Sequence, residues 1–319
     1  MKAKVRTFSG TTSNEITQRE IANRALARKA AAEGIVLLKN NNALPYKLDT
    51  KISVFGRCQL DYFYVGYGSG GDVNAPYFVN VIDGIKNAGG HVNEWLLEYY
   101  KDFTKNNPAP HGFWGHWPMN FEEPSLDDKI IERASEESDV ALVVIGRAAG
   151  EDRENTLTKG SYYLTDEERT LLDNVCNHFS NVTVLLDCGN IIDMQWVLDY
   201  EERLRGIIYA WQGGMESGNA IADVLFGRVN PSGRLTDTVA VRYEDYPSAM
   251  HFGNKLFNTY VEDIFVGYRY FETFSKEKAL FPFGYGLSYT NFDIEVLDFK
   301  SDNDKIMVEV RVTNIGDVA

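Results

Sequence analysis

The sequence has few cysteines and none of the cysteine or histidine patterns that bind metal ions. Its 319 residues include three cysteines, Cys58, Cys176 and Cys188, and five histidines, with no Cys-x-x-Cys pair and no histidine cluster. Cysteines that are few, widely spaced and odd in number do not suit a disulfide framework. We therefore expect buried free thiols, a reducing compartment and no metal or other cofactor.

Clustered basic residues and long apolar runs are missing as well. The formal net charge is −14 at pH 7, and the lysines and arginines do not gather in the way that nucleic-acid binding requires. No apolar run approaches the length that spans a membrane. Residues 1–6 lead into polar residues, where a signal peptide would have its apolar core. These absences predict a cytoplasmic protein with no nucleic-acid partner and no membrane contact.

Two common catalytic and nucleotide-binding signatures are also absent. The sequence has no Gly-x-Ser-x-Gly segment, so its histidines lack a serine-hydrolase context. The glycine-rich segment 66–71 has neither the Gly-Lys-Ser/Thr ending of a nucleotide-binding loop nor the spacing of a dinucleotide fingerprint. This argues against a nucleotide-binding regulator. We interpret the segment as a tight turn that lets the backbone approach a ligand closely.

What the sequence does contain is an alternation of apolar strands and helical patterns. Strands are predicted at 35–38, 52–56, 140–145, 182–186 and 204–210, and helices at 14–33, 77–88, 126–138, from 165, near 192–202 and at 215–226. Asn14 can cap the first helix, and Thr165 with Glu168 forms a capping box. Strands separated by helices indicate βαβ units. We predict an α/β fold, a mostly parallel-sheet three-layer sandwich with helices on both faces.

The pattern changes near the end of the chain. Residues 293–297 and 306–312 alternate between polar and apolar side chains, as half-buried antiparallel strands do. Two strands are too few for a stable sandwich, so we interpret them as the truncated start of a β-sandwich domain. The expected domains are a helical lead-in at 1–25, the α/β sandwich at 26–290 and this partial β-sandwich at 291–319.

The strongest functional candidate is Glu151, which follows the apolar run at 140–145. Such a run suits a strand buried on both faces of a parallel sheet, and open α/β sheets place ligands at the carboxyl ends of their strands. A carboxyl group that acts as a general acid needs a raised pKa, which burial or nearby negative charge provides. The alternative is a surface ion-pair cluster without chemistry, formed by Arg147, Asp152, Arg153 and Glu154.

Two other segments carry polar residues at the predicted rim of the sheet, and a third segment is a loop rich in aromatic residues. The segments 187–190 and 211–216 follow strands, and we interpret both as structural. The loop 106–124 is rich in proline, glycine and aromatic residues and contains His111, Trp114, His116 and Trp117. An exposed aromatic loop can form a binding wall, and a disordered surface excursion is the alternative.

Seven blocks of the sequence together resemble glycoside hydrolase family 3, the β-glucosidase and β-xylosidase family. They lie, in the order of the family, at 31–40 with 44–45, 68–70, 150–153, 213–216, 227–235, 266–270 and 283–289. The resemblance implies that this chain is the family's second domain, an α/β sandwich that normally follows a catalytic barrel. It further implies that residues 292–319 begin a fibronectin type III-like domain.

The resemblance also implies a division of the catalytic residues between domains. In the family, the barrel supplies the aspartate nucleophile, and the sandwich supplies the acid/base glutamate on a loop that aligns with Glu151. The residues then expected to contact substrate are Tyr67, Gly68, Ser69 and Arg153. The family usually has one or two residues between its glutamate and an Asp-Arg pair, whereas Glu151 directly precedes Asp152. Glu154 is the alternative acid/base.

Only a short segment precedes the predicted sandwich. This arrangement resembles that of family members with reversed domain order, in which the barrel follows the fibronectin-like domain, and it implies a barrel downstream of Ala319. The prediction is the acid/base part of a retaining, exo-acting β-glucosidase that acts on β-glucosides or cello-oligosaccharides in cellulose degradation. One alternative is a β-xylosidase of the same family, and another is an isolated module that binds carbohydrate or a partner without catalysis. Self-association into a homo-oligomer is compatible with the sequence.

Overall fold

A six-stranded sheet forms the centre of the computed structural model, which describes residues 15–68, 71, 75–110, 112, 116–151, 155–200, 202–316 and 318. Its strands are β1 (Val36–Asn40), β2 (Lys51–Phe55), β3 (His91–Val92), β4 (Val140–Arg147), β5 (Val182–Cys188) and β6 (Leu204–Tyr209). The strand order is β1-β6-β5-β4-β2-β3, and every neighbouring pair is parallel except β1 and β6. The predicted mostly parallel α/β sheet is confirmed, with one antiparallel strand at its edge.

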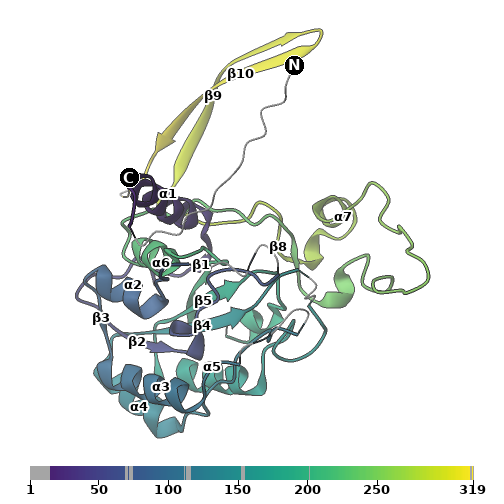
Figure 1. Cartoon of the computed structure of the whole chain (residues 1–319). Helices are drawn as coiled ribbons and strands as arrows, with labels where there is room; N and C mark the ends of the chain where they lie inside the picture. Colours follow the sequence, from purple (N-terminus) through teal and green to yellow (C-terminus); the bar gives the residue numbers. More distant parts are fainter. Residues whose placement is uncertain are drawn as a thin grey trace, which may run out of the picture.

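Helices cover both faces of this sheet (Figure 1). The helices are α1 (Gln18–Gly34), α2 (Val81–Asn87), α3 (Glu94–Asn106), α4 (Asp128–Glu137), α5 (Asp166–His178), α6 (Ser217–Leu225) and α7 (Tyr268–Phe274). Side chains of α3, α4 and α5 pack in one apolar cluster, and most of the buried side chains of α2 and α6 pack in a second. The helix α1 contacts α6 from outside. Two clusters separated by one sheet make the three layers that the sequence predicts.

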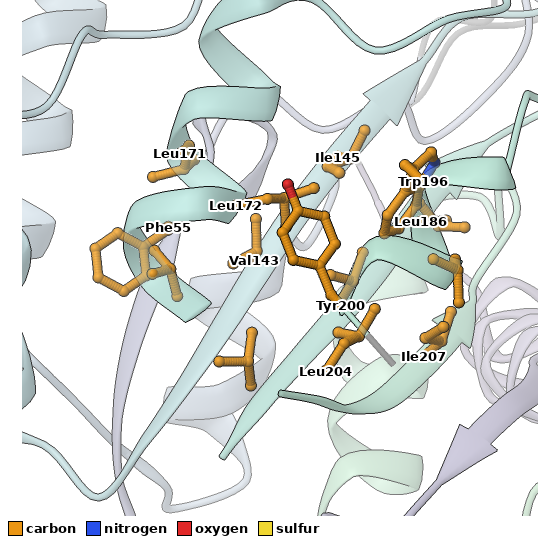
Figure 2. Packing of buried hydrophobic residues seen from close by; sticks show 14 of the residues in the cluster. Phe55, Val143, Ile145, Leu171, Leu172, Leu186, Trp196, Tyr200, Leu204 and Ile207 are labelled. Atoms are coloured by element: carbon orange, nitrogen blue, oxygen red, sulfur yellow. The ribbon is translucent and has the colours of Figure 1, made fainter. Parts of the chain in front are cut away.

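The apolar run of β4 is divided between the two clusters. Leu142 and Val144 belong to the cluster that contains α2 and α6, whereas Val143 and Ile145 belong to the cluster that contains α3, α4 and α5. Figure 2 shows the latter cluster, in which Leu172 of α5 lies near Val143. Because successive side chains of a strand point to opposite faces, burial of both faces requires an apolar run without alternation.

The helix caps agree with the sequence at one helix and differ at another. Thr165 and Glu168 form the predicted capping box at the start of α5. The helix α1 begins after Thr17, whose side chain and that of Glu20 form a second capping box. Asn14, the cap expected from the sequence, lies outside the described residues. Since α1 runs through residues 25 and 26, the predicted limit between the lead-in and the sandwich falls inside one helix.

Two helical segments differ from the prediction. The segment near 192–202 contains a 3₁₀ helix, η2 (Gln195–Tyr200), in place of an α-helix. Trp196 donates from Nε1 to the carbonyl of Asp193 at 2.8 Å, which holds the start of this tighter turn. The helix α3 was not among the helices predicted from the sequence. Asn93 caps it, and Leu96 and Tyr100, four residues apart, are buried. That cap and that spacing are the signal that could have found it.

Short elements follow α6 and complete the α/β region. They are β7 (Val239–Ala240), η3 (Tyr243–Asp245), η4 (Lys276–Lys278) and β8 (Ala279–Phe281), and η1 (Arg57–Gln59) lies earlier in the chain, after β2. The segment between η3 and α7 makes an excursion away from the sheet (Figure 1). All three cysteines are free and buried, as predicted. Among the helices of the described residues, none has the length and apolar character needed to cross a membrane.

The two strands predicted near the C-terminal end form an antiparallel hairpin that projects from the α/β region (Figure 1). They are β9 (Phe292–Asp302) and β10 (Lys305–Asn314). The register shifts between Glu309 and Val310, which pair with Asp298 and Val296, so Leu297 is the extra residue of a bulge in β9, at the point where the sequence alternation of that strand breaks. The apolar face of the hairpin is exposed and consists of Phe292, Ile294, Val296, Phe299, Ile306, Val308, Val310 and Val312. Its assignment to a fibronectin type III-like domain, and the domain limits, stay predictions.

Candidate active site

Glu151 lies just beyond the carboxyl end of β4. Every residue of that strand is buried, and Ala148 after it is buried as well. Glu151, four residues past the last strand residue, is exposed. The chain thus passes from the core to the rim of the sheet within four residues of the end of β4. The carboxylate of Glu151 lies at the edge where doubly wound sheets place their ligands.

The end of β4 is held by a buried ion pair. Arg147 donates to both carboxylate oxygens of Glu168 at 2.6 Å, and it also donates to the carbonyls of Ser161 and Tyr163. Both charged side chains are almost completely buried. Arg147 thus does not belong to the surface ion-pair cluster that the sequence suggested, because the start of α5 and the loop before it enclose its guanidinium. The other members of that cluster, Asp152, Arg153 and Glu154, lie outside the described residues.

The glycine-rich segment packs against the chain next to Glu151. The amide of Tyr67 donates to the carbonyl of Ala149 at 2.7 Å, and the amide of Glu151 donates to the carbonyl of Tyr67 at 3.0 Å. These bonds make a parallel bridge between Tyr67 and Gly150. A Cβ atom on Gly150 would lie 2.3 Å from the carbonyl oxygen of Tyr67. The close backbone approach seen here is therefore to the chain's own backbone, and it fixes the position of residue 151.

The side chain of Glu151 lies against Gly68. A Cβ atom on Gly68 would be 2.4 Å from Cβ of Glu151 and 3.0 Å from its Oε2. Gly68 also has φ +104°, a conformation that favours glycine. The structure thus brings together three of the predicted site residues, Tyr67, Gly68 and Glu151. The other two, Ser69 and Arg153, lie outside the described residues.

A buried carboxyl group holds the segment that precedes the glycine-rich turn. Asp187, at the carboxyl end of β5, accepts a hydrogen bond from the amide of Phe63 at 2.7 Å. Burial raises the pKa of this carboxyl group well above its ordinary value. The contact supports the structural interpretation of segment 187–190. Its signal in the sequence is a polar residue at the end of an apolar strand, which does not reveal Phe63 as the partner.

Aromatic rings from two loops stack beside the turn. Tyr67 stacks on Trp117 with centroids 5.3 Å apart and planes at 7°, and Phe63 stacks on Phe121 at 4.5 Å. The loop 106–124 therefore packs against the ring of Tyr67 through Trp117, which is 9% exposed, and its role as a binding wall stays a prediction. His116 is exposed, while His111 and Trp114 lie outside the described residues.

A cavity of about 400 Å³ opens between these loops. Its described lining is mostly aromatic and apolar and includes Tyr64, Tyr67, Phe78, Ala109, Trp117 and Phe121. We refer to it as the aromatic pocket. Within the described ranges, no group of three or more His, Cys, Asp or Glu side chains is arranged to hold a metal ion.

Fold and site define a three-layer α/β sandwich domain that presents an exposed carboxylate at the carboxyl edge of its sheet. Residues 35–289 match the family described as the glycosyl hydrolase family 3 C-terminal domain. The chain belongs to this family.

Two β-glucosidases and an arabinopyranosidase are among the proteins to which this chain is similar. The chain is 46% identical over 294 residues to a β-glucosidase of Ruminococcus albus, covering 92% of this chain and 31% of that protein. The structure of a β-glucosidase from Paenibacillus barengoltzii matches with a TM-score of 0.90 at 48% identity, over 92% of this chain and 33% of that one. An exo-α-(1→6)-L-arabinopyranosidase of Bifidobacterium breve is 30% identical, with 93% and 38% covered. The chain thus spans about a third of the length of these relatives.

Proposed function

We propose that this chain is the acid/base-bearing part of a retaining, exo-acting β-glucosidase that hydrolyses terminal β-D-glucosyl residues. The observation that carries the proposal is the placement of Glu151, exposed at the carboxyl end of a fully buried strand and fixed through its own amide to the carbonyl of Tyr67. Family membership and the β-glucosidases among the relatives support the reaction class. The chain covers a third of these relatives, so the remainder of the site would come from further parts of the protein.

In the proposed mechanism Glu151 acts first as an acid and then as a base. An aspartate of a barrel domain, proposed downstream of Ala319, attacks the anomeric carbon. Glu151 gives its proton to the glycosidic oxygen, and the aglycone leaves as an alcohol. Glu151, now a carboxylate, takes a proton from water as the water attacks the same carbon. This step releases the aspartate and yields glucose with retained configuration.

The arrangement of this chain suits such a division. A retaining enzyme needs its two carboxyl groups about 5–5.5 Å apart, which demands a firmly placed acid/base. The two hydrogen bonds of Tyr67 with Ala149 and Glu151, and the buried pair of Arg147 and Glu168, supply that placement. Since Glu151 is exposed in this chain, the water exclusion that general acid catalysis benefits from would come from the covering domain.

The test is Glu151→Ala in the complete enzyme. Turnover of glucosides with poor leaving groups should fall by roughly 10²–10⁴-fold, the range for general acid catalysis. With an activated leaving group such as 2,4-dinitrophenol, added azide should restore the rate and yield β-glucosyl azide. Glu167→Ala, which changes an exposed glutamate on α5, is the matched control and should leave turnover unchanged.

The same experiment separates Glu151 from its alternative. Glu154→Ala should have a much smaller effect on turnover. If azide rescued Glu154→Ala and not Glu151→Ala, the acid/base role would be assigned to Glu154. Full activity of Glu151→Ala on unactivated substrates would reject the proposal.

A second candidate, a module that binds carbohydrate or a partner domain without catalysis, describes the 319 residues by themselves. It is favoured by the share of the relatives that the chain covers, about a third. The isolated chain assayed on 4-nitrophenyl β-glucoside should show no measurable turnover. Turnover by the isolated chain would contradict a nucleophile on another domain. Cytoplasmic location, a role in cellulose degradation and homo-oligomerisation remain predictions.

A further inference from the structure

We propose that Asn155 and Asn190 are positioning residues for the acid/base, because their paired side-chain amides fix the far end of the loop that carries Glu151. The inference rests on the proposed function and deepens it. Asn155 is the first described residue after Glu151, and three residues separate the two in the sequence. The hydrogen bonds of Tyr67 hold the near end of this loop, so an anchor at residue 155 restricts the loop from both sides.

The anchor is a set of side-chain hydrogen bonds between the loops that follow β4 and β5. Nδ2 of Asn155 donates to the carbonyl of Ile191 at 3.1 Å, and Oδ1 of Asn155 accepts from Nδ2 of Asn190 at 3.1 Å. The carbonyl of Asn190 accepts in turn from the hydroxyl of Tyr209, a fully buried residue of β6. Both polar atoms of the Asn155 side chain are therefore bonded to a segment that neighbouring strands of the sheet hold in place.

A second set of bonds holds the chain directly after Asn155. The amide of Thr156 donates to Oγ of Ser161 at 2.9 Å, and Ser161 is buried. The carbonyl of Ser161 accepts from Nε of Arg147, the last residue of β4, at 3.1 Å. The chain thus leaves β4, passes through the loop and returns to a contact with the end of the same strand.

Two fixed ends restrict where the carboxylate of Glu151 can lie. The four residues from 151 to 155 span at most about 14 Å when extended, and a loop this short with fixed ends has few backbone conformations. A general acid must meet the glycosidic oxygen at hydrogen-bond distance, and a displacement of about 1 Å costs up to roughly 10²-fold in rate. Loss of the anchor at Asn155 gives the loop more conformations, and fewer of them place Glu151 for proton transfer.

The leaving group of the substrate separates this role from a structural one. Asn155, Asn190 and Ile191 are each half-buried, and one such hydrogen bond contributes about 0.5–1.5 kcal/mol to stability, so the fold should survive its loss. A defect of the fold lowers the rate on every substrate alike. Misplacement of the acid, in contrast, lowers the rate on those substrates whose leaving group needs a proton.

The test measures kcat/KM of the complete enzyme on cellobiose and on 2,4-dinitrophenyl β-D-glucoside. In Asn155→Ala the value for cellobiose should fall roughly 10- to 100-fold. The value for the dinitrophenyl glucoside, whose leaving group departs without a proton, should change by less than about threefold. Asn190→Ala should show the same pattern with a smaller loss, because Asn155 keeps its bond to Ile191.

Three further variants make the test specific. Asn190→Leu keeps the branched shape of the side chain without a donor for Asn155, and it should lower the value for cellobiose in the same direction. The double variant Asn155→Ala/Asn190→Ala should lose no more than Asn155→Ala alone, since the two residues share one anchor. Asn87→Ala is the matched control: it removes an amide–amide hydrogen bond of 3.0 Å to Asn219, between α2 and α6, and should leave both values unchanged.

The outcomes are distinct. A loss confined to cellobiose in the Asn155 and Asn190 variants supports the positioning role. Equal losses on both substrates assign the pair to the fold alone and overturn the inference, as does an unchanged value for cellobiose or a double variant whose losses add. None of these results touches the proposed function, which fails when Glu151→Ala keeps full activity on cellobiose. In that case this inference fails with it.

Discussion

Carboxyl groups near the carboxyl edge of the sheet fall into two sets that differ in burial. Glu123, Glu168 and Asp187 are buried, and each accepts hydrogen bonds from backbone amides or from an arginine. Glu151 lies at the same edge and is exposed. The buried set fixes the loops and strand ends, and the exposed carboxylate is carried by the backbone that they fix. Carboxyl groups thus serve structure below the rim and, by our proposal, chemistry above it.

The largest loss of stability is expected when Arg147, the cation that pairs with the buried carboxylate of Glu168, is replaced. Arg147→Met leaves the carboxylate of Glu168 buried without its cation, which should lower the free energy of unfolding by about 3–5 kcal/mol. Urea unfolding followed by circular dichroism measures the change. Lys159→Ala is the matched control, because its pair with Asp166 at the start of the same helix is exposed and should be worth less than about 1 kcal/mol. Equal losses for the two variants would show that the buried pair has no special role.

Glu123 should make stability depend on pH. Burial, with the nearby carboxylate of Glu168, raises the pKa of Glu123 to about 8. The folded protein then keeps a proton up to that pH, whereas the unfolded chain releases it near pH 4.5. Because the unfolded state binds fewer protons in this range, this group lowers the free energy of unfolding as pH rises, by up to about 1.4 kcal/mol per pH unit. The loss is complete once the pH exceeds the folded pKa.

Glu123→Gln removes this titration and tests its sign. Relative to the unaltered protein, the variant should gain stability as the pH is raised from 5 to 7, by up to about 2–3 kcal/mol. Unfolding in urea at pH 5, 6 and 7 measures the difference. A difference between the two proteins that does not vary with pH would contradict a raised pKa for Glu123.

A smaller effect is expected at Asp187. Asp187→Ala leaves the buried amide of Phe63 without its acceptor, which should cost about 1–2 kcal/mol. Asp187→Asn keeps an acceptor oxygen, and burial already disfavours the charged form of the carboxyl group by raising its pKa, so this substitution should cost clearly less. Thermal unfolding of both variants checks this order. If asparagine proves as harmful as alanine, the acceptor role of Asp187 is wrong.

Sequence patterns could predict the fold because burial of both faces makes each parallel strand a continuous apolar run. They could also predict the place of Glu151, since it follows such a run directly. The contacts that hold it could not be predicted. Arg147 and Glu168 are 21 residues apart, and Asp187 and Phe63 are 124 apart. Pairs at such separations depend on strand order and loop course, which local periodicity does not encode.

The smallest effect on stability is expected at Glu151 itself. Replacement of an exposed side chain usually changes stability by no more than about 0.5 kcal/mol, and Glu151 is exposed. Glu151→Ala should therefore unfold in urea within that margin of the unaltered chain, although the same substitution should sharply reduce turnover in the complete enzyme. Gly68→Ala is the informative companion, because its Cβ would lie 2.4 Å from Cβ of Glu151 and its φ is positive. It should displace the carboxylate and lower activity at a measurable cost in stability. A large stability loss in Glu151→Ala would place this residue with the buried carboxyl groups that serve the fold.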